Sequence, residues 1–408
     1  MIESIDIVKP LLSDAIGVES SVGYLRSDDS VHFNWHCHEA VTQPDAIITP
    51  RYTENSAGLM VAIVGDLAQA GDPGEGLYWS ADGCDWNVAS GASGQQVKDV
   101  ELSPLDDSLG IFVTSNGDGS GGIYRTEDAG QTWNSTEVQY DDRSFRTVRF
   151  ARGEAGSIWV AAIQREPLRA WIYRSVDSGL SWEEHEVEVP EDSDPFTYLD
   201  VVAVDADDPL TAWFVMGPYL DDRLLKTTDG GASLVEVFSI ERDIIDGAQD
   251  ENGDLWLVLS GNSIVLGSED DVFEELRSAP MSLGVETDAD TVMLATRVLA
   301  AGGPLASSRD GRSFEVNDAF SVLSPLTHCS TESHYVASCL PLWSELESKV
   351  GASSQDTGDT GFVGAAEATD DHSSDQINPS GCCRSHTKQS GAALMVLLVF
   401  ALRRRHLG

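Results

Sequence analysis

The chain has 408 residues, of which 41% are hydrophobic and 23% charged, a composition typical of a folded globular protein and not of a disordered one. Acidic residues outnumber basic residues by 68 to 25, and the formal net charge of −43 disfavours nucleic acid as a partner. The 37 glycines indicate a fold with many tight turns.

The first twenty residues do not have the pattern of a secretory signal peptide. No basic segment precedes an apolar run, and Lys9 and Pro10 interrupt the apolar stretch that is present. The opposite end of the chain nevertheless predicts export, as described below. We therefore expect that the natural start lies upstream of Met1 or that the gene is truncated.

An early strand is rich in histidine. His36 and His38 would share one face of that strand, with His32 before them and Glu39 after them. No further set of side chains shows the spacing of zinc ligands, so we expect no metal site and interpret these histidines as partly exposed polar residues.

A short motif recurs along the chain. Residues 123–133 read IYRTEDAGQTW, residues 172–182 read IYRSVDSGLSW, and residues 224–234 read LLKTTDGGASL. Shortened copies follow the same pattern at 80–86 and 308–314, and degenerate copies occur at Ser27/Asp29/Phe33 and Ser268/Asp270/Phe273. The residues of the five better copies are Ser80, Asp82, Gly83 and Trp86; Thr126, Asp128, Gly130, Thr132 and Trp133; Ser175, Asp177, Gly179, Ser181 and Trp182; Thr227, Asp229, Gly231 and Ser233; and Ser308, Asp310, Gly311 and Phe314.

Each copy has the chemistry of a β-hairpin tip. The aspartate can accept backbone N–H bonds inside a tight turn, the glycine supplies a positive φ, and the aromatic residue begins the next strand. Two further strands precede the motif, as in residues 100–104 with 111–113 and residues 201–205 with 213–215. The repeating unit therefore contains four strands.

The spacing of the units predicts the fold. The aspartates lie at 29, 82, 128, 177, 229, 270 and 310, and a four-stranded propeller blade takes about 40–50 residues. One blade cannot bury both faces of its sheet, so blades stack around an axis. We predict an all-β fold, a β-propeller of seven four-stranded blades over residues 1–344, with six blades as the alternative. No stretch before residue 390 shows sustained helical periodicity.

The motifs resemble the Asp boxes, or BNR repeats, of sialidases, sortilin-type propellers and photosystem II assembly-factor-like propellers. This resemblance implies that the box lies at the periphery of each blade and that its aspartates are structural. A sialidase would also need an arginine cluster, a tyrosine nucleophile with a glutamate, and an acidic aspartate, and the early Arg-Ile-Pro segment of that family is replaced by Thr-Pro-Arg-Tyr at 49–52. We expect no catalytic residue and no cofactor, with a diverged exo-glycosidase as the alternative.

A ligand site is expected on the face opposite the Asp-box turns. The loops between blades and between the middle strands of each blade reach that face, and their mixture of charge and tyrosine suits a protein or glycan ligand. The alternative is that these are solvated loops of an acidic protein. The candidate residues are Tyr140, Asp142, Arg143, Arg146, Arg165, Arg169, Tyr219, Asp222 and Arg223.

The six cysteines suggest disulfides in an exported protein. We predict a Cys37–Cys84 bridge between the first two blades and a local Cys329–Cys339 bridge in the last blade. Free buried thiols are the alternative if the chain stays in the cytoplasm.

The C-terminal part of the chain changes in character. Residues 345–380 are rich in Ser, Gly, Asp and Thr and predict a disordered linker. Within 381–408, Cys382 and Cys383 precede an apolar helix at 391–402 and three arginines; this helix would cover about 18 Å, too short to span a bilayer.

This order of elements resembles the myxobacterial C-terminal sorting tail (MYXO-CTERM). The resemblance implies export, membrane anchoring through the tail, processing near Cys382 or Cys383 by a sorting protease, and retention at the cell surface or outer membrane. An ordinary weak tail anchor is the alternative. We therefore predict an exported, surface-held propeller that binds a protein or glycan, with a purely structural or assembly role as a further alternative.

Overall fold

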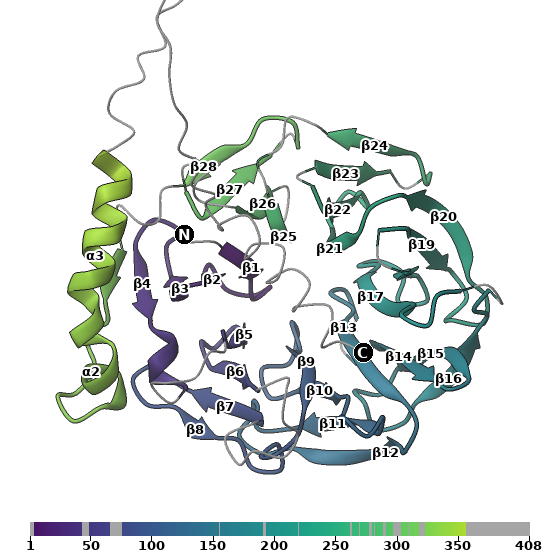
Figure 1. Cartoon of the computed structure of the whole chain (residues 1–408), viewed down its shortest axis with the longest axis horizontal. Helices are drawn as coiled ribbons and strands as arrows, with labels where there is room; N and C mark the ends of the chain where they lie inside the picture. The colour runs from purple at the N-terminus through teal and green to yellow at the C-terminus, as the bar shows by residue number, and fades with distance from the viewer. Residues whose placement is uncertain are drawn as a thin grey trace, which may run out of the picture. The chain divides into compact units, whose positions relative to one another are not determined.

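Seven antiparallel sheets follow one another along the chain and form a ring (Figure 1). The computed structural model describes residues 4–42, 49–65, 76–154, 156–190, 193–218, 220–261, 263–268, 270–276, 280, 282–288, 291–296, 303–309, 311–317 and 323–355. Each sheet is a blade in which four consecutive strands pair in sequence order. The prediction of an all-β propeller with seven four-stranded blades is confirmed.

The strands of the first four blades are as follows. Blade 1 contains β1 (Ser4–Val8), β2 (Ile16–Ser20), β3 (Gly23–Ser27) and β4 (Phe33–His36). Blade 2 contains β5 (Arg51–Glu54), β6 (Met60–Val64), β7 (Gly76–Ser80) and β8 (Asn87–Val88). Blade 3 contains β9 (Val97–Leu102), β10 (Gly110–Thr114), β11 (Gly121–Thr126) and β12 (Asn134–Tyr140), and blade 4 contains β13 (Ser144–Phe150), β14 (Ile158–Arg165), β15 (Leu168–Ser175) and β16 (Glu183–Val187).

The remaining blades repeat this order. Blade 5 contains β17 (Tyr198–Val204), β18 (Ala212–Gly217), β19 (Asp222–Thr227) and β20 (Val235–Ile240). Blade 6 contains β21 (Ile244–Gln249), β22 (Leu255–Leu259), β23 (Ser263–Gly267) and β24 (Phe273–Leu276). Blade 7 contains β25 (Ser282–Asp288), β26 (Thr291–Thr296), β27 (Leu305–Ser308) and β28 (Glu315–Asn317). Every Asp-box copy, including the weak ones at Asp29 and Asp270, lies between the third and fourth strands of its blade.

The hydrophobic core is divided among the interfaces between neighbouring blades. Seven clusters of buried side chains occur among the described residues, and each joins two adjacent blades. Strands such as β6 and β18 are apolar and buried along their whole length, so both faces of the sheet are covered by neighbouring blades, which a single blade could not do.

The Asp-box glycine is required by this packing as well as by its turn. Gly130 has a φ of 92°, and a Cβ at this position would lie 2.7 Å from Cγ2 of Val61 in the second strand of the preceding blade. Gly179 approaches Ile111 and Gly311 approaches Trp256 in the same way. The glycine thus permits both the left-handed turn and close contact between blades.

The C-terminal segment returns to the first two blades. After β28, strand β29 (Leu323–Pro325) pairs in parallel with β4 as a fifth strand of blade 1. Two helices follow, α2 (His334–Ser338) and α3 (Leu340–Gln355), and Figure 1 shows them outside β4. Disulfides join Cys37 to Cys339 and Cys84 to Cys329.

The predicted disulfide pairing is therefore wrong, although all four cysteines are bridged. The prediction paired cysteines that are near in sequence, whereas in the structure a distant segment lies against blades 1 and 2. Tyr335 donates its hydroxyl to the Trp35 carbonyl at 2.9 Å and accepts the Leu326 N–H at 2.9 Å, which places this segment against blade 1.

The expectation of no helix before residue 390 is also wrong. Helix α3 extends to Gln355, and so occupies the first residues of the segment 345–380 that was expected to be a linker. The helix has few apolar residues, so its sequence shows no clear helical periodicity. It nevertheless packs on the ring, because Trp343 contacts Trp35 with ring centroids 5.7 Å apart and Leu346 is buried. The remainder of the linker, Cys382, Cys383 and the apolar run at 391–402 lie outside the described residues. No helix of the described part of the chain has the length and apolarity to cross a membrane.

Candidate functional site

The Asp boxes form closed hydrogen-bond networks. In blade 4 the Ser175 hydroxyl donates to Asp177 at 2.9 Å and accepts the Gly179 N–H at 2.8 Å. Asp177 also accepts the N–H and the hydroxyl of Ser181 at 2.8 and 2.6 Å. Blades 3 and 5 repeat this geometry. These carboxylates are engaged in their own turns and hold the hairpin tips.

The pKa of the box aspartates reflects these bonds. The hydroxyl and N–H of Ser233 hold the pKa of the Asp229 carboxyl below its usual range. The shortened copy in blade 2 keeps the Gly83 N–H bond to the Ser80 hydroxyl and the Cys84 N–H bond to Asp82, both at 2.9 Å. Asp310 of the seventh copy lies outside the described residues.

Arg143, a candidate on the opposite face, is enclosed by aromatic rings. Its guanidinium lies 3.8 Å from the Tyr140 ring centroid and 3.9 Å from that of Trp171, and it pairs with Glu184 at 2.9 Å. The Tyr140 hydroxyl donates to the same glutamate at 2.6 Å. This cation–π cluster joins the connection between blades 3 and 4 to the outer strands of blade 4. Arg143 therefore stabilises the fold through contacts within the protein.

Three more candidates connect neighbouring elements. Arg146 forms a two-bond ion pair with Asp200 of the next blade at 2.7 and 3.0 Å. Arg165 donates to the carbonyls of Pro195 and Thr197 at 2.9 and 2.7 Å. Buried Asp222 accepts the Tyr198 hydroxyl at 2.6 Å and the Ile244 N–H at 2.7 Å. Each of these side chains holds a loop or a blade in place.

The other candidates lie closer to solvent. Arg169 and Glu186 form a long pair at 3.5 Å with exposed fractions of 50% and 55%, and Arg223 and Glu236 form a similar one at 3.8 Å. Asp142 is exposed, and Tyr219 lies outside the described residues. The structure therefore does not gather the candidates into one site: most are structural and a few remain on the surface.

The sequence reasoning missed a charged cluster at the ring axis. Arg149 of β13 in blade 4 lies 3.1 Å from Asp99 of blade 3 and 3.9 Å from Asp246 of blade 6. Arg152, just after β13, pairs with Glu286 and donates to the Thr287 carbonyl of blade 7 at 2.9 Å. Blade 4 is adjacent to neither blade 6 nor blade 7, so these contacts cross the axis. Figure 1 shows the innermost strands β1, β5, β9, β13, β17, β21 and β25 around that axis.

The acidic residues of this cluster also accept hydrogen bonds from backbone N–H groups at the unpaired inner edges of the sheets. Asp99 accepts the Val148 N–H of the next blade at 3.0 Å, and Asp246 accepts the Val285 N–H of the next blade at 2.9 Å. An innermost strand has no further strand to pair with, so a side chain from the preceding blade must take its N–H groups. Bulges precede both acids in their strands and aim them at the neighbouring blade.

Two of these carboxyl groups have raised pKa values. Burial inside the ring raises the pKa of Glu101 to about 8, with Asp99 and Glu286 adding to the shift and Arg149 opposing it. Burial and the nearby Asp6 raise the pKa of Asp246 as well. The side chains of Glu101 and Asp246 keep exposed fractions of 27% and 18%. The raised pKa values favour the neutral forms of these two carboxyl groups beside Arg149.

The histidines and cysteines that the structure describes do not form an open ligand set. One group of three possible metal ligands occurs among the described residues, formed by Cys84, His328 and Cys329, and both of its sulfur atoms are in a disulfide. His36 ends β4 and His38 begins a 3₁₀ turn (His38–Ala40), so they do not share a strand face as expected. His36 is also buried, not partly exposed as expected. His38 bonds to the Ser20 carbonyl at 3.1 Å.

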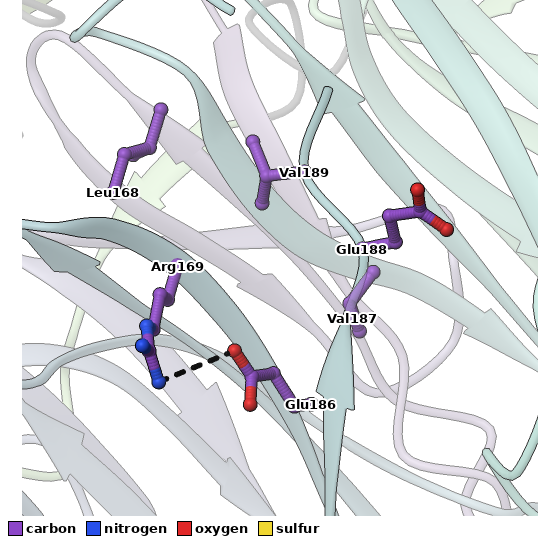
Figure 2. Close-up of a pocket in the computed structure, with 6 residues that line it drawn as sticks. All are labelled: Leu168, Arg169, Glu186, Val187, Glu188 and Val189. Carbon is purple, nitrogen blue, oxygen red and sulfur yellow. Dashed lines mark ion pairs between the residues drawn. The ribbon is translucent and has the colours of Figure 1, made fainter. Parts of the chain in front are cut away.

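A shallow hollow lies on blade 4. Leu168 and Arg169 at the start of β15 face Glu186 and Val187 at the end of β16, and residues 188–189 complete the lining (Figure 2). This hollow contains Arg169, one of the predicted ligand-face residues.

A faint sequence signal for the axial cluster does exist. Arg149 lies between Val148 and Phe150, and Asp246 follows Ile244 and Ile245, and a charged residue beside apolar ones in a strand is a pattern that marks buried polar networks. Nothing in the sequence, however, indicates which acid would meet which arginine across the ring.

Comparison with solved structures establishes the same fold. The chain aligns with the GH74 xyloglucanase from Xanthomonas campestris at a TM-score of 0.55 and 12% identity, covering 76% of this chain and 53% of that chain. An ancestral GH74 enzyme aligns at a TM-score of 0.55 and 13% identity, covering 76% of this chain and 46% of that one. The chain thus spans about half the length of these two proteins.

A third structure, YCF48 from Cyanidioschyzon merolae, aligns at a TM-score of 0.48 and 14% identity, over 72% of this chain and 92% of that one; this score supports no inference. The sequence matches no protein-family model and no curated protein. At these identities the likeness establishes a β-propeller fold and leaves activity to be argued from the site.

Proposed function

We propose that this chain is an exported, surface-held β-propeller that acts as a binding or scaffold module for a protein or a glycan. The observation that carries the proposal is the pairing of the axial arginines. Arg149 and Arg152 are each engaged by carboxylates from other blades, whereas a sialidase-like enzyme would present such arginines to its substrate. Recognition is therefore assigned to the outer surface of the ring and its loops.

The disulfides support export. Disulfides persist in oxidising compartments, and here two of them fasten the C-terminal segment to the ring. Surface retention through the C-terminal tail, with processing near Cys382 or Cys383, is part of the same proposal. Cell fractionation, with mass spectrometry of the C-terminal peptide, tests it: a soluble cytoplasmic protein with an intact tail would contradict it.

Binding is tested with the full, oxidised chain. The protein is applied to a glycan array and used to capture extracellular proteins, with a heat-unfolded sample as control. A saturable ligand that the folded chain retains and the unfolded chain does not would support the proposal. Failure to retain any ligand in either format would contradict it and favour a purely structural role.

A glycoside hydrolase is the second candidate, favoured by one observation. Glu101 and Asp246 lie 4.0 and 3.9 Å from different nitrogens of Arg149 and are partly exposed, and Glu101 has a pKa suited to a general acid. The test is hydrolysis of fluorogenic glycosides and of xyloglucan by the wild-type chain and by Glu101→Gln. Activity that the substitution abolishes would support this function, and a wild-type chain without hydrolysis would refute it.

A further inference from the structure

The outer edge of blade 4 combines a free strand with a hollow. Strand β16 pairs with β15 on one side only, which leaves its outer backbone groups without a strand partner in the described part of the chain. At the end of β16 the hollow of about 490 Å³ opens. Figure 2 shows Leu168 and Val189 facing each other across it, with the Arg169–Glu186 ion pair beside them.

The floor of this hollow is apolar and belongs to the core between two blades. Val187 is buried in the cluster between blades 4 and 5, and Leu168 and Val189 pack against that cluster. The chain then continues to Phe196, whose exposed fraction is 58%. The loop around Phe196 is held by Arg165, which donates to the carbonyls on both sides of it. An apolar side chain of a partner would therefore meet preformed surfaces.

The charge around the hollow is acidic. Glu186 and Glu188 are both exposed and flank the buried Val187, and Figure 2 shows Glu186 extending toward Arg169 and Glu188 extending away from it. Arg169 is the one basic residue that lines the hollow. A second copy of this chain would bring a net charge of −43 to this edge, so like charges oppose self-pairing while a basic segment is attracted.

We propose that this hollow and the free edge of β16 dock an extended, basic segment of a partner protein. The segment alternates lysine or arginine with aliphatic residues: an aliphatic side chain enters between Leu168 and Val189, and the cations face Glu186 and Glu188. Its backbone adds to the edge of β16 as a further strand. The inference rests on the proposed function as a binding module and specifies the class of partner.

The test uses fluorescence anisotropy with the full, oxidised chain. A short labelled peptide that alternates lysine and valine should bind, more weakly at high salt because the attraction is screened, and a glutamate–valine peptide should not. Glu186→Lys with Glu188→Lys should lower the affinity at least about tenfold, or about 1.4 kcal/mol. Leu168→Ser should also weaken binding.

A matched control lies on the next blade. Glu236 of β20 makes a comparable exposed pair with Arg223, and Glu236→Lys should leave the affinity within about twofold, a difference well below the tenfold step. Equal melting temperatures would show that the variants fold. The inference is overturned if the wild-type chain does not bind the lysine–valine peptide, or if the double variant binds this peptide with the same affinity as the wild type. A protein or glycan ligand that is retained regardless of the blade 4 substitutions overturns this inference alone and leaves the proposed function standing.

Discussion

Removal of the two disulfides tests how the ring is held closed. The bridges join cysteines that are 302 and 245 residues apart in sequence, and both attach the segment around α2 to blades 1 and 2. Apart from them, closure depends on β29, on the packing of β1 against blade 7, and on the shared cluster of apolar residues. Serine substitution at each pair of cysteines separates these contributions.

The expected loss follows from the loops that the bridges close. Either bridge alone restricts the unfolded chain by about 5–6 kcal/mol through loop entropy. With one in place, the other closes only the residual loop made of residues 37–84 and 329–339, about 57 residues, and adds about 4 kcal/mol. Loss of one bridge should therefore lower the free energy of unfolding by up to about 4 kcal/mol. Loss of both should cost up to about 10 kcal/mol, comparable with the whole stability of a domain.

Guanidinium unfolding of the oxidised full chain, followed by the fluorescence of its 10 tryptophans, measures this loss. Each single-bridge variant should unfold cooperatively at a lower midpoint, and the variant without either bridge should lack a cooperative transition. Substitution of Cys382 and Cys383 by serine is the matched control and should leave the midpoint unchanged. A variant without either bridge that unfolds at the wild-type midpoint would refute the reasoning, because ring closure would then depend on noncovalent contacts alone.

Two further predictions concern a buried histidine and an Asp box. His36 is 2% exposed, and burial, with Arg26 and His328 nearby, lowers its pKa to about 3. In the unfolded chain this histidine takes up its proton near pH 6.5. The free energy of unfolding should therefore be largest above pH 6.5 and fall as the pH drops toward 3. His36→Phe should flatten this decline in the pH dependence of the unfolding midpoint, and an unchanged slope would contradict the assignment. Asp177→Ala removes the acceptor of two Ser181 hydrogen bonds and should lower the free energy of unfolding by about 1–3 kcal/mol. As a control, Asp142→Ala in an exposed loop should change the free energy of unfolding by less than about 0.5 kcal/mol. Equal effects of the two substitutions on the melting temperature would show that the Asp box does not stabilise the fold.

The Asp-box turns could be predicted because their contacts are local. Asp128 bonds to Thr126 and Thr132, which lie two and four residues away, so the motif carries its own geometry wherever it occurs. The strands around each box indicate four strands per unit, the spacing of the boxes matches the length of a propeller blade, and the need to bury both faces of each sheet closes the units into a ring. Even the weak copy at Asp29 forms its turn, with the N–H groups of Val31 and His32 bonded to the carboxylate.

The candidate ligand residues could be placed only in part. The prediction that they lie in loops between blades or between middle strands follows from strand order. Whether a charge faces solvent or another residue depends on neighbours about 30–50 positions away, as for Arg143 with Tyr173 and for Arg146 with Asp200. Arg149 and Arg152 were missed for the same reason, because Asp246 and Glu286, which they contact, belong to blades across the axis.

The sequence by itself determined the repeating unit and its hairpin tips, because these depend on residues within one unit, and it favoured seven blades over six. The tertiary structure alone decided the cysteine pairing, the return of α2 and α3 to blade 1, and the charged bridge across the ring. Those features join segments as far apart as 302 residues, and only closure of the ring brings them within bonding distance.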